Sequence, residues 1–383
     1  MMAIAKATRG LSETGDALLL TPGPLTTSKS VKEAMLHDWG SRDAGFLKIN
    51  REVLEWLPEI VNVGGIYAAV PMQGSGTFAV EAMLTTFVPA NGKVLVLVNG
   101  AYGLRAKRIL EIARREHRVY QTPEDTAPDP AEVDRILDQG GFSHIFAVHC
   151  ETTSGILNPI ERIGRVAENH GVRMLVDAMS AFGAIPLDAG LLRLDAVAAS
   201  SNKCIEGVPG LGFVICKPEA LAASTGNATT LTLDLHDQWA AYNKTGQYRF
   251  TPPIHVIVAF HQALTEFRAE GGWSGRNRRY SENARVLIEG MRKLGFKTLL
   301  PDDLQAPIIV TFHMPTDKAF VFQAFYDKLK DRGYVIYPGK LTVADSFRIG
   351  CIGRLNADHM RGAVAAIAEV LAEMGVNRLE AAA

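Results

Sequence analysis

One lysine stands in the segment Ala199-Ser-Ser-Asn-Lys-Cys-Ile-Glu-Gly-Val-Pro-Gly-Leu-Gly212, between two apolar runs of the chain. These runs, Leu194–Ala199 and Leu211–Cys216, are typical of buried strands, and the glycines and proline between them indicate a turn. We therefore expect Lys203 to lie on a turn between two strands. Desolvation there would lower the pKa of the lysine, and its free amine could then form a Schiff base. The alternative is an ordinary surface lysine on a loop.

The pattern around this segment is strand, loop and helix, repeated. Apolar runs of strand length occur at residues 66–70, 94–98, 144–148, 172–176, 196–199 and 211–216, with helix-like segments between the first five. Runs that are apolar throughout are typical of strands buried on both faces. The alternation predicts an α/β fold with a mostly parallel sheet flanked by helices. The last two runs have no helix between them, so one of these two strands could be antiparallel.

The composition indicates an ordinary globular protein and argues against several classes of function. Of the 383 residues, 47% are hydrophobic and 21% are charged, which is ample material for a core. The formal net charge of -1 gives no electrostatic reason to expect nucleic acid or an anionic membrane as partner. The four cysteines form no C-x-x-C pair, so we expect a cytoplasmic protein with reduced thiols and no metal site. No apolar run has the length of a membrane-spanning helix or a signal peptide.

Three further features follow predicted strands, at the edge where doubly wound sheets bind ligands. Gln73-Gly-Ser-Gly-Thr77 opens a predicted helix whose first N–H groups suit a phosphate, although a glycine turn capped by Thr77 is the alternative. Asp177 ends a buried strand, where a carboxylate needs a cation such as a protonated ring nitrogen; a helix cap or a structural ion pair is the alternative. Tyr102 could stack on a flat ring or serve only in packing.

Lys203 and these three features together match the needs of pyridoxal 5'-phosphate. That cofactor requires a lysine for its aldehyde, an acid for its ring nitrogen, a cradle for its phosphate and a face for its ring. Asp177 precedes Lys203 by 26 residues (203 − 177), which corresponds to one strand and one loop. We therefore predict an enzyme that depends on pyridoxal phosphate.

Eight segments, in the same order along nearly the whole chain, resemble those of the class V group of fold-type-I pyridoxal-phosphate aminotransferases. They are Leu20–Thr27, Gln73–Thr77, Val98–Gly103, His149–Gly155, Val176–Ser180, Ser200–Gly210, Tyr248–Pro253 and Phe347–Gly353. Asn-Lys-Cys-Ile followed by Gly-Val-Pro-Gly is typical of the phosphonate branch of that group. The resemblance implies an aminotransferase that moves the amino group of 2-aminoethylphosphonate to pyruvate. It also implies a large domain with a seven-stranded sheet and a smaller C-terminal α/β domain.

The resemblance further assigns site residues one position at a time. Lys203 would hold the cofactor, and Asp177 would pair with its ring nitrogen. Tyr102 would stack on the ring, and Thr153, or Ser154 in its place, would reach the phenolic oxygen. The residues that would hold the phosphate are Ser75, Gly76, Thr77 and Asn202. Those implied elsewhere are Arg348 and Gly23 at the substrate, and Thr251 at the phosphate of a partner, which implies a homodimer with active sites at the interface.

One segment departs from the family pattern. Trp39-Gly-Ser-Arg-Asp43 has an arginine where the family often has tryptophan. Arg42 could line the substrate mouth and favour a dianionic phosphonate, or it could be a solvated loop arginine. The departure leaves open a serine or alanine aminotransferase that uses glyoxylate or pyruvate. A regulator that binds the cofactor without catalysis is disfavoured, because a neutral chain with no basic arm leaves no place for a DNA-binding module.

We also expect three parts along the chain. Residues 1–25 would form an N-terminal segment that packs with the small domain. Residues 26–273 would form the large domain that binds pyridoxal phosphate. Residues 274–383 would form the small C-terminal domain, and a long helix near residues 274–294 would bridge the two domains.

Overall fold

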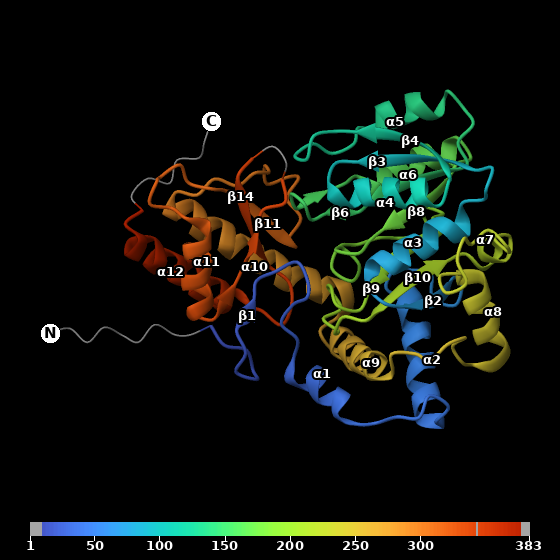
Figure 1. Ribbon diagram of the computed structural model, residues 1–383, viewed down its shortest axis with the longest axis horizontal. Coiled ribbons are helices and arrows are strands. Elements are labelled where there is room, and N and C mark those ends of the chain that lie inside the picture. The colour runs from blue at the N-terminus through green and yellow to red at the C-terminus, as the bar shows by residue number, and fades with distance from the viewer. Residues whose placement is uncertain (1–9, 342–343, 377–383) are drawn as a thin grey trace.

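A seven-stranded sheet forms the centre of the larger of two lobes (Figure 1). The structure, a computed structural model, describes residues 10–341 and 344–376. The strands lie in the order β2-β10-β9-β8-β5-β3-β4, and only β10 runs antiparallel to its neighbours in this sheet. The predicted α/β fold with a mostly parallel sheet is therefore confirmed, including one antiparallel strand among the last two runs. The strands are β2 (Ala68–Gln73), β3 (Lys93–Val98), β4 (Glu116–Gln121), β5 (His144–Val148), β8 (Arg173–Asp177), β9 (Ala196–Ser200) and β10 (Leu211–Cys216).

Helices cover both faces of this sheet because its central strands are apolar on both sides. Successive side chains of a strand point to opposite faces. Val96 and Val98 accordingly pack with helices α3, α4, α7 and α8, whereas Leu95 and Leu97 belong to the cluster of α1, α2, α5, α6 and α9. The helices are α1 (Lys29–Glu33), α2 (Ala44–Glu59), α3 (Gly76–Phe87), α4 (Ala101–Ile112), α5 (Pro130–Leu137), α6 (Ile160–Asn169), α7 (Pro218–Ala222), α8 (Leu235–Thr245) and α9 (Ile254–Ala269), with a 3-10 turn at Ala34–Leu36.

Strand β4 is the one member of the sheet that no apolar run predicted. Its sequence, Glu116-His-Arg-Val-Tyr-Gln121, is mostly polar, and its side chains are partly or fully exposed. The strand pairs only with β3 and so forms an edge of the sheet. An edge strand has a solvated side, and a search for continuous apolar runs therefore misses it.

The smaller lobe contains an antiparallel sheet of three strands, β11, β14 and β13, packed against helices. Helix α10 (Gly272–Leu294) runs between the lobes (Figure 1), as predicted for a bridging helix. The other elements of this lobe are β11 (Ile309–His313), α11 (Phe322–Asp331), β12 (Tyr334–Val335), β13 (Tyr337–Pro338), β14 (Ser346–Gly350) and α12 (Ala357–Met374). The boundaries placed at residues 25 and 273 stay predictions, and residues 1–9 and 377–383 lie outside the described part of the chain.

A short N-terminal strand, β1 (Leu18–Leu19), joins the first residues of the chain to the smaller lobe. It pairs in parallel with β12, with Leu18 opposite Tyr334. Leu18 and Leu20 are fully buried in the core of that lobe. The chain then crosses to the large lobe through Pro22 and Gly23, which brings these residues close to the site described below.

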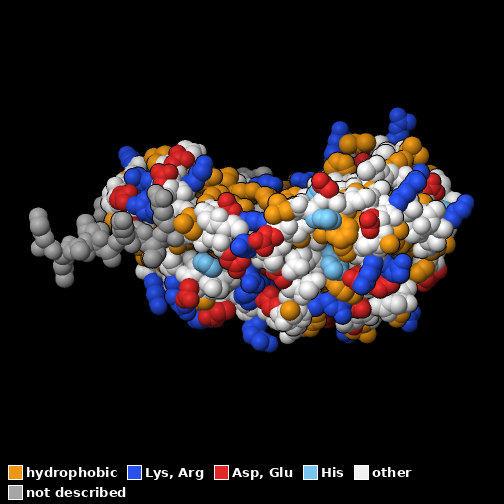
Figure 2. All heavy atoms as spheres, turned by 90° about the horizontal axis from the view of Figure 1, so that it is seen from below, with side chains coloured by type: hydrophobic (Ala, Val, Ile, Leu, Met, Phe, Trp, Pro, Cys, Tyr) orange, Lys and Arg blue, Asp and Glu red, His pale blue; other side chains and the backbone are white. Residues whose placement is uncertain are grey.

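Charged side chains of both signs are interspersed over the face shown in Figure 2, in keeping with the net charge of -1. The outline of this face is hollowed between the two lobes, and hydrophobic side chains gather there. Within the described residues, no helix is both long and apolar enough to cross a membrane.

Candidate active site

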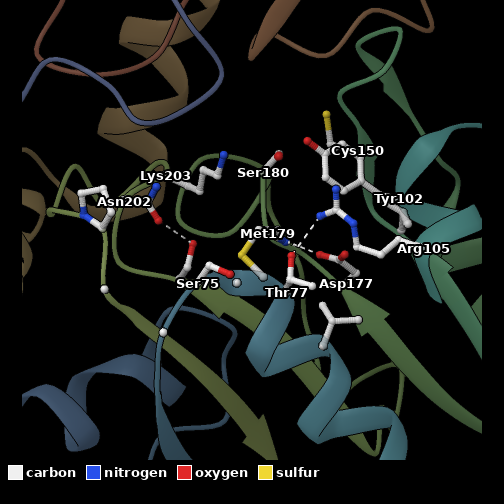
Figure 3. A pocket seen from close by; sticks show the side chains of 17 residues that line it. Ser75, Thr77, Tyr102, Arg105, Cys150, Asp177, Met179, Ser180, Asn202 and Lys203 are labelled. Carbon is white, nitrogen blue, oxygen red and sulfur yellow. Dashed lines mark hydrogen bonds between the residues drawn. The ribbon is translucent and has the colours of Figure 1, made fainter. Parts of the chain in front are cut away.

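A cavity of about 310 Å³ opens where strands β2, β3, β5, β8 and β9 end. Its volume lies within the range of small-molecule sites. It is lined by residues from the loops that follow these strands, so the topology brings together segments far apart in sequence (Figure 3). The residues predicted for the site that line the cavity are Ser75, Gly76, Thr77, Tyr102, Asp177, Asn202 and Lys203.

Lys203 lies on the turn between β9 and β10, as its flanking apolar runs predicted. The turn is closed by hydrogen bonds from the Ser201 N–H to the Leu211 carbonyl at 3.0 Å and from the Gly207 N–H to the Ser201 carbonyl at 2.8 Å. A Cβ atom on Gly207 would lie 2.8 Å from that Ser201 oxygen, so the turn needs glycine there. Burial lowers the pKa of the Lys203 amine, which favours the neutral form that acts as a nucleophile.

The N-terminal segment holds the end of the Lys203 side chain. Its Nζ atom donates to the Pro22 carbonyl at 2.7 Å and lies 3.4 Å from the Gly23 carbonyl. A Cβ atom on Gly23 would lie 2.7 Å from the same Nζ, and Gly23 has a φ of 109°, so only glycine suits this contact. Gly23 is thus placed beside the reactive lysine, although it does not line the cavity.

A buried ionic network fixes the other side of the lysine turn. Glu206 is 3% exposed and has a φ of 67°, which is uncommon for a residue with a side chain. Its Oε1 atom lies 2.7 Å from Arg279 Nη2 and 3.2 Å from Arg276 Nη1. Both arginines belong to α10, and Arg279 also donates to the Gly353 carbonyl of the smaller lobe at 2.6 Å. The lysine turn, the bridging helix and the smaller lobe are therefore joined at one point.

Asp177 ends strand β8 and is 4% exposed. Its Oδ1 atom accepts a hydrogen bond from the Met179 N–H at 2.9 Å. Burial raises the pKa of the Asp177 carboxyl to about 6, and the charge of Glu151 adds to this rise. No described cation forms an ion pair with Asp177, so the structural ion pair considered as an alternative is absent among the described residues. A buried carboxylate of this kind suits a cationic group on a ligand, such as a protonated ring nitrogen.

The start of helix α3 forms an anion cradle at the other end of the cavity. The first N–H groups of a helix have no partner within it, and the Ser75 side chain makes no hydrogen bond that caps this one. A Cβ atom on Gly76 would lie 2.2 Å from the Met179 sulfur, so a side chain there would displace the end of Met179. Arg105, which the sequence analysis missed, donates from Nη1 to Thr77 Oγ1 at 2.9 Å. These groups fit a phosphate.

Tyr102 stands on the first turn of α4, and a buried acid that the sequence analysis missed holds that turn. Glu151, in the short hairpin β6 (Cys150–Glu151) and β7 (Ile156–Leu157), is fully buried. Its Oε2 atom accepts from the Tyr102 N–H at 3.0 Å, and its Oε1 accepts from the Thr153 hydroxyl at 2.6 Å. Because Gly100 at the helix start has no side chain to cap it, the distant carboxylate takes that role.

Thr153 is placed behind the cavity wall. It is fully buried, its hydroxyl donates to Glu151, and it accepts from the Ala101 N–H at 2.9 Å. The Ser154 hydroxyl is also buried and has no hydrogen-bond partner among the described residues. The structure thus gives Thr153 a role in holding α4, and its predicted contact with the cofactor stays a prediction.

Arg348 lies on β14 of the smaller lobe and is 2% exposed. Its Nη1 atom donates across the lobes to the Thr152 carbonyl at 2.7 Å, and its Nε donates to the Pro338 carbonyl at 3.1 Å. No carboxylate within the described ranges forms an ion pair with it. A guanidinium that is buried with neutral partners is suited to bind an anion from a substrate.

Like Gly23 and Thr153, three further predicted residues do not line the cavity: Arg348, Arg42 and Thr251. Arg42 stands in an exposed turn before α2 and does not line the cavity. Thr251 is exposed, and its carbonyl accepts a hydrogen bond from the side chain of Gln73, next to the anion cradle. The predicted contact of Thr251 with a partner's phosphate therefore concerns a second copy of the chain.

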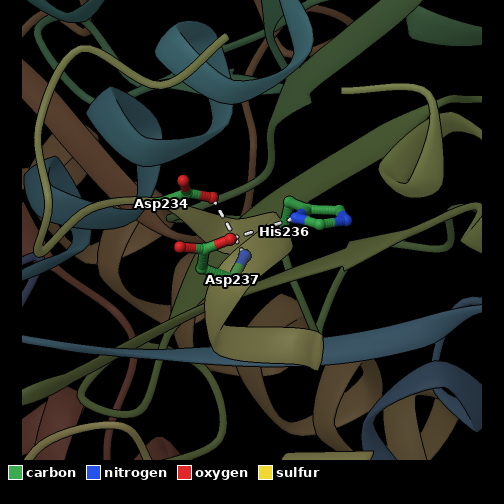
Figure 4. Close-up of side chains that lie close together, drawn as sticks. All are labelled: Asp234, His236 and Asp237. Atoms are coloured by element: carbon green, nitrogen blue, oxygen red, sulfur yellow. Dashed lines mark hydrogen bonds and ion pairs between the residues drawn. The ribbon is translucent and has the colours of Figure 1, made fainter. Parts of the chain in front are cut away.

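A cluster of acidic and histidine side chains lies outside this site, at the start of α8 (Figure 4). Asp234 Oδ1 accepts from the Asp237 N–H at 3.0 Å, which caps the helix. Asp237 Oδ2 pairs with Arg249 Nη2 at 3.3 Å, and Asp237 Oδ1 lies 3.2 Å from His236 Nδ1. Capping and ion pairing account for these groups, and we assign no metal to them.

Comparisons with known proteins agree with this geometry. The family described as aminotransferase class-V matches residues 67–340. A Pseudomonas putida F1 protein named 2-aminoethylphosphonate–pyruvate transaminase is 51% identical over 360 residues, which cover 94% of this chain and 98% of that protein. A Pseudomonas aeruginosa UCBPP-PA14 protein of the same name is also 51% identical, with 94% and 97% covered. The crystal structure of ureidoglycine-glyoxylate aminotransferase from Bacillus subtilis has the same fold, with a TM-score of 0.86 at 21% identity and 94% of each chain covered.

Proposed function

Because the chain belongs to the class-V aminotransferase family, we propose that it is a pyridoxal-phosphate-dependent transaminase that moves the amino group of 2-aminoethylphosphonate to pyruvate. The products are phosphonoacetaldehyde and L-alanine. The observation that carries the chemistry is that Lys203 and Asp177 share one cavity with an anion cradle. The substrates follow from the two Pseudomonas transaminases, which match the chain over nearly its whole length.

When bound, pyridoxal phosphate supplies an aldehyde that captures the amine and a ring that accepts electrons. Lys203 would hold it, and the freed Nζ, neutral because it is buried, would take the proton from the carbon that bears the amine. Asp177 would keep a proton on the ring nitrogen, and Tyr102 would cover the ring. The groups proposed to hold the phosphate are Ser75, Gly76, Thr77, Arg105 and Asn202.

A half-reaction tests the proposed function. The enzyme loaded with cofactor and mixed with 2-aminoethylphosphonate alone is expected to lose the long-wavelength absorbance of the lysine-bound cofactor within seconds. Addition of pyruvate should restore the absorbance and form one equivalent of alanine. Serine tested in the same way should react far more slowly. If serine reacts faster than the phosphonate, the chain is instead an aminotransferase of amino acids.

Arg348→Met is expected to raise the KM for pyruvate about a hundredfold, because loss of one buried charged contact costs about 3 kcal/mol. The Arg348 guanidinium has no carboxylate partner among the described residues, so it can bind the carboxylate of pyruvate. Arg354→Met is the matched control, since Arg354 is exposed and pairs with Glu13 at 3.3 Å. Steady-state rates with varied pyruvate measure the effect. A change confined to the amine substrate would show that Arg348 has been misassigned.

We also propose that the enzyme works as a homodimer whose interface covers the cavity mouth. Exposed hydrophobic side chains lie close in sequence to three site residues. Phe78, which is 48% exposed, follows Thr77; Phe250, at 42%, precedes Thr251; and Leu104, at 44%, stands two residues after Tyr102. Hydrophobic side chains around the mouth of a site favour a protein interface. Sedimentation analysis checks this proposal, and a particle with the mass of one chain would contradict it.

A cytoplasmic location is proposed as well. The four cysteines are free and buried in the structure. Free thiols are typical of proteins kept in a reducing compartment. Fractionation of cells with an antibody against the protein would test this assignment.

A further inference from the structure

We propose that Lys340 is a second cation for the substrate phosphonate and sets the preference of the site for that group over a carboxylate. This inference rests on the proposed function and concerns a residue that the sequence analysis did not single out.

Lys340 reaches the active site from the smaller lobe. Its Nζ atom lies 5.4 Å from the centroid of the Tyr102 ring, and Tyr102 lines the cavity. Burial is the main cause of the lowered pKa of Lys203, and the charge of Lys340 contributes to it. The Lys340 ammonium therefore lies within electrostatic range of the reactive amine.

The backbone that carries Lys340 is tied to the strand that carries Arg348. The Gly339 N–H donates to the Ser346 carbonyl at 2.9 Å, which extends the pairing of β13 with β14. Arg348 Nε donates to the Pro338 carbonyl, two residues before Lys340, at 3.1 Å. The buried guanidinium and the exposed ammonium are thus placed by one small antiparallel unit at the boundary between the lobes.

Lys340 is free to bind a ligand. No carboxylate in the described ranges forms an ion pair with it, and its ammonium lies over the face of Tyr102 instead. Lys328, another lysine of the smaller lobe, is paired with Glu373 at 3.1 Å. An unpaired cation beside the mouth of an anion-binding site adds to the local positive potential and lowers the free energy of a bound anion.

The carboxylate of pyruvate and the phosphonate of the amine substrate need different numbers of cationic donors. A carboxylate has two oxygens and one charge, and a single guanidinium can satisfy both oxygens at once. A phosphonate has three oxygens and, like a phosphate ester, carries more than one negative charge near neutral pH. The third oxygen and the additional charge need a further donor, and a lysine ammonium on a flexible stem suits that role. Lys340 should therefore contribute more to the phosphonate than to pyruvate.

Two arginines, Arg105 and Arg42, are less suited to the substrate phosphonate. Arg105 donates to Thr77 Oγ1 in the anion cradle, at the end of the cavity assigned to the cofactor phosphate. Arg42 stands in an exposed turn before α2 of the large lobe, whereas Lys340 lies against Tyr102 of the cavity wall. Lys340 combines a backbone tied to the strand of Arg348 with an ammonium that forms no ion pair among the described residues.

The test compares Lys340→Met, Lys340→Arg and Lys328→Met in the enzyme loaded with cofactor. Ethylphosphonate and propionate, which carry the two anions without an amine, serve as probes, and calorimetry gives their Kd. Lys340→Met is expected to weaken ethylphosphonate about fivefold, the effect of one exposed charged contact, and propionate less than about twofold. Lys340→Arg should keep most of the affinity, and Lys328→Met should change neither. The KM for 2-aminoethylphosphonate should rise in parallel, with kcat nearly unchanged.

Equal weakening of both probes, or no weakening of ethylphosphonate, would overturn the role given to Lys340. The effect should also shrink as salt is added, because the contact is exposed. The wild-type enzyme separates this inference from the proposed function. Suppose that Lys340→Met weakens ethylphosphonate selectively but the wild type does not turn over 2-aminoethylphosphonate. The proposed function would then be wrong, and the role of Lys340 in binding the anion would stand.

Discussion

Lys203→Ala is expected to lower transamination at least about ten-thousandfold, since a positioned proton-transfer group contributes about 10²–10⁴ and the covalent link to the cofactor is lost as well. The long-wavelength absorbance of the lysine-bound cofactor should disappear with it. Stopped-flow rates and absorbance spectra of the purified variant measure both effects. An undiminished rate would mean that another group carries the chemistry.

Lys217→Ala is the matched control for this substitution. Lys217 follows β10, is partly buried and pairs with Asp195 at 3.2 Å, but it does not line the cavity. Its loss should leave transamination nearly unchanged. A small primary amine added to Lys203→Ala should restore part of the rate, because it can replace the missing proton acceptor. A fold defect alone would not respond to added amine.

Asp177→Asn is expected to lower kcat about a thousandfold, since an amide cannot keep a proton on the ring nitrogen and loss of one partner of a buried ion pair costs about 3–5 kcal/mol. The size of the side chain is nearly unchanged, so packing around β8 should survive. Single-turnover rates with 2-aminoethylphosphonate measure the loss. A rate within a factor of a few of the wild type would show that Asp177 does not face the ring nitrogen.

The same variant gives a second readout after the cofactor has been removed. In the folded chain, burial raises the pKa of Asp177 from 3.8 to about 6. Between these values the folded state holds a proton that the unfolded state has lost, so the contribution of Asp177 to stability is largest below pH 3.8 and is lost as pH rises through about 6. The loss is about 3 kcal/mol, because each tenfold change in the acid constant is worth about 1.4 kcal/mol. Burial also lowers the pKa of His144 and His149 to about 4, so both proteins gain stability from these histidines as pH rises from 4 to 7. Urea unfolding should therefore show the wild type losing stability relative to Asp177→Asn over this range, and a constant difference between the two proteins would contradict the buried titration.

The sheet and the core of the site could be predicted because each depends on short segments. Strands buried on both faces are apolar throughout, so their runs stand out in the sequence. Lys203, Asp177 and Thr77 each follow such a run, and the topology of a parallel sheet brings the ends of its strands together. Local sequence and general topology were therefore sufficient to predict that Asp177, Lys203 and the anion cradle lie together.

The missed residues depend on contacts between distant segments. Glu151 is held by N–H groups that belong to a helix 48 residues earlier (151 − 103), and nothing in its own hairpin indicates this partnership. Lys340 approaches from the other lobe, and its place depends on how the lobes pack. Arg105 is the exception, since it stands three residues after Tyr102, and this spacing places both side chains on one face of a helix. A search for cations at that spacing would have found it.

The pairing of β1 with β12 joins residues that are 316 positions apart (334 − 18). A ribosome therefore finishes the whole large lobe long before the partner of the first strand exists, and closing so long a loop is slow. The Pro22 carbonyl, which accepts the hydrogen bond from Lys203 Nζ, lies four residues after Leu18. We therefore expect the nascent chain to form the large sheet first and to position the Lys203 amine last. Protease pulses during translation in vitro would detect a cleavable N-terminal segment until synthesis ends, and early protection would contradict this order.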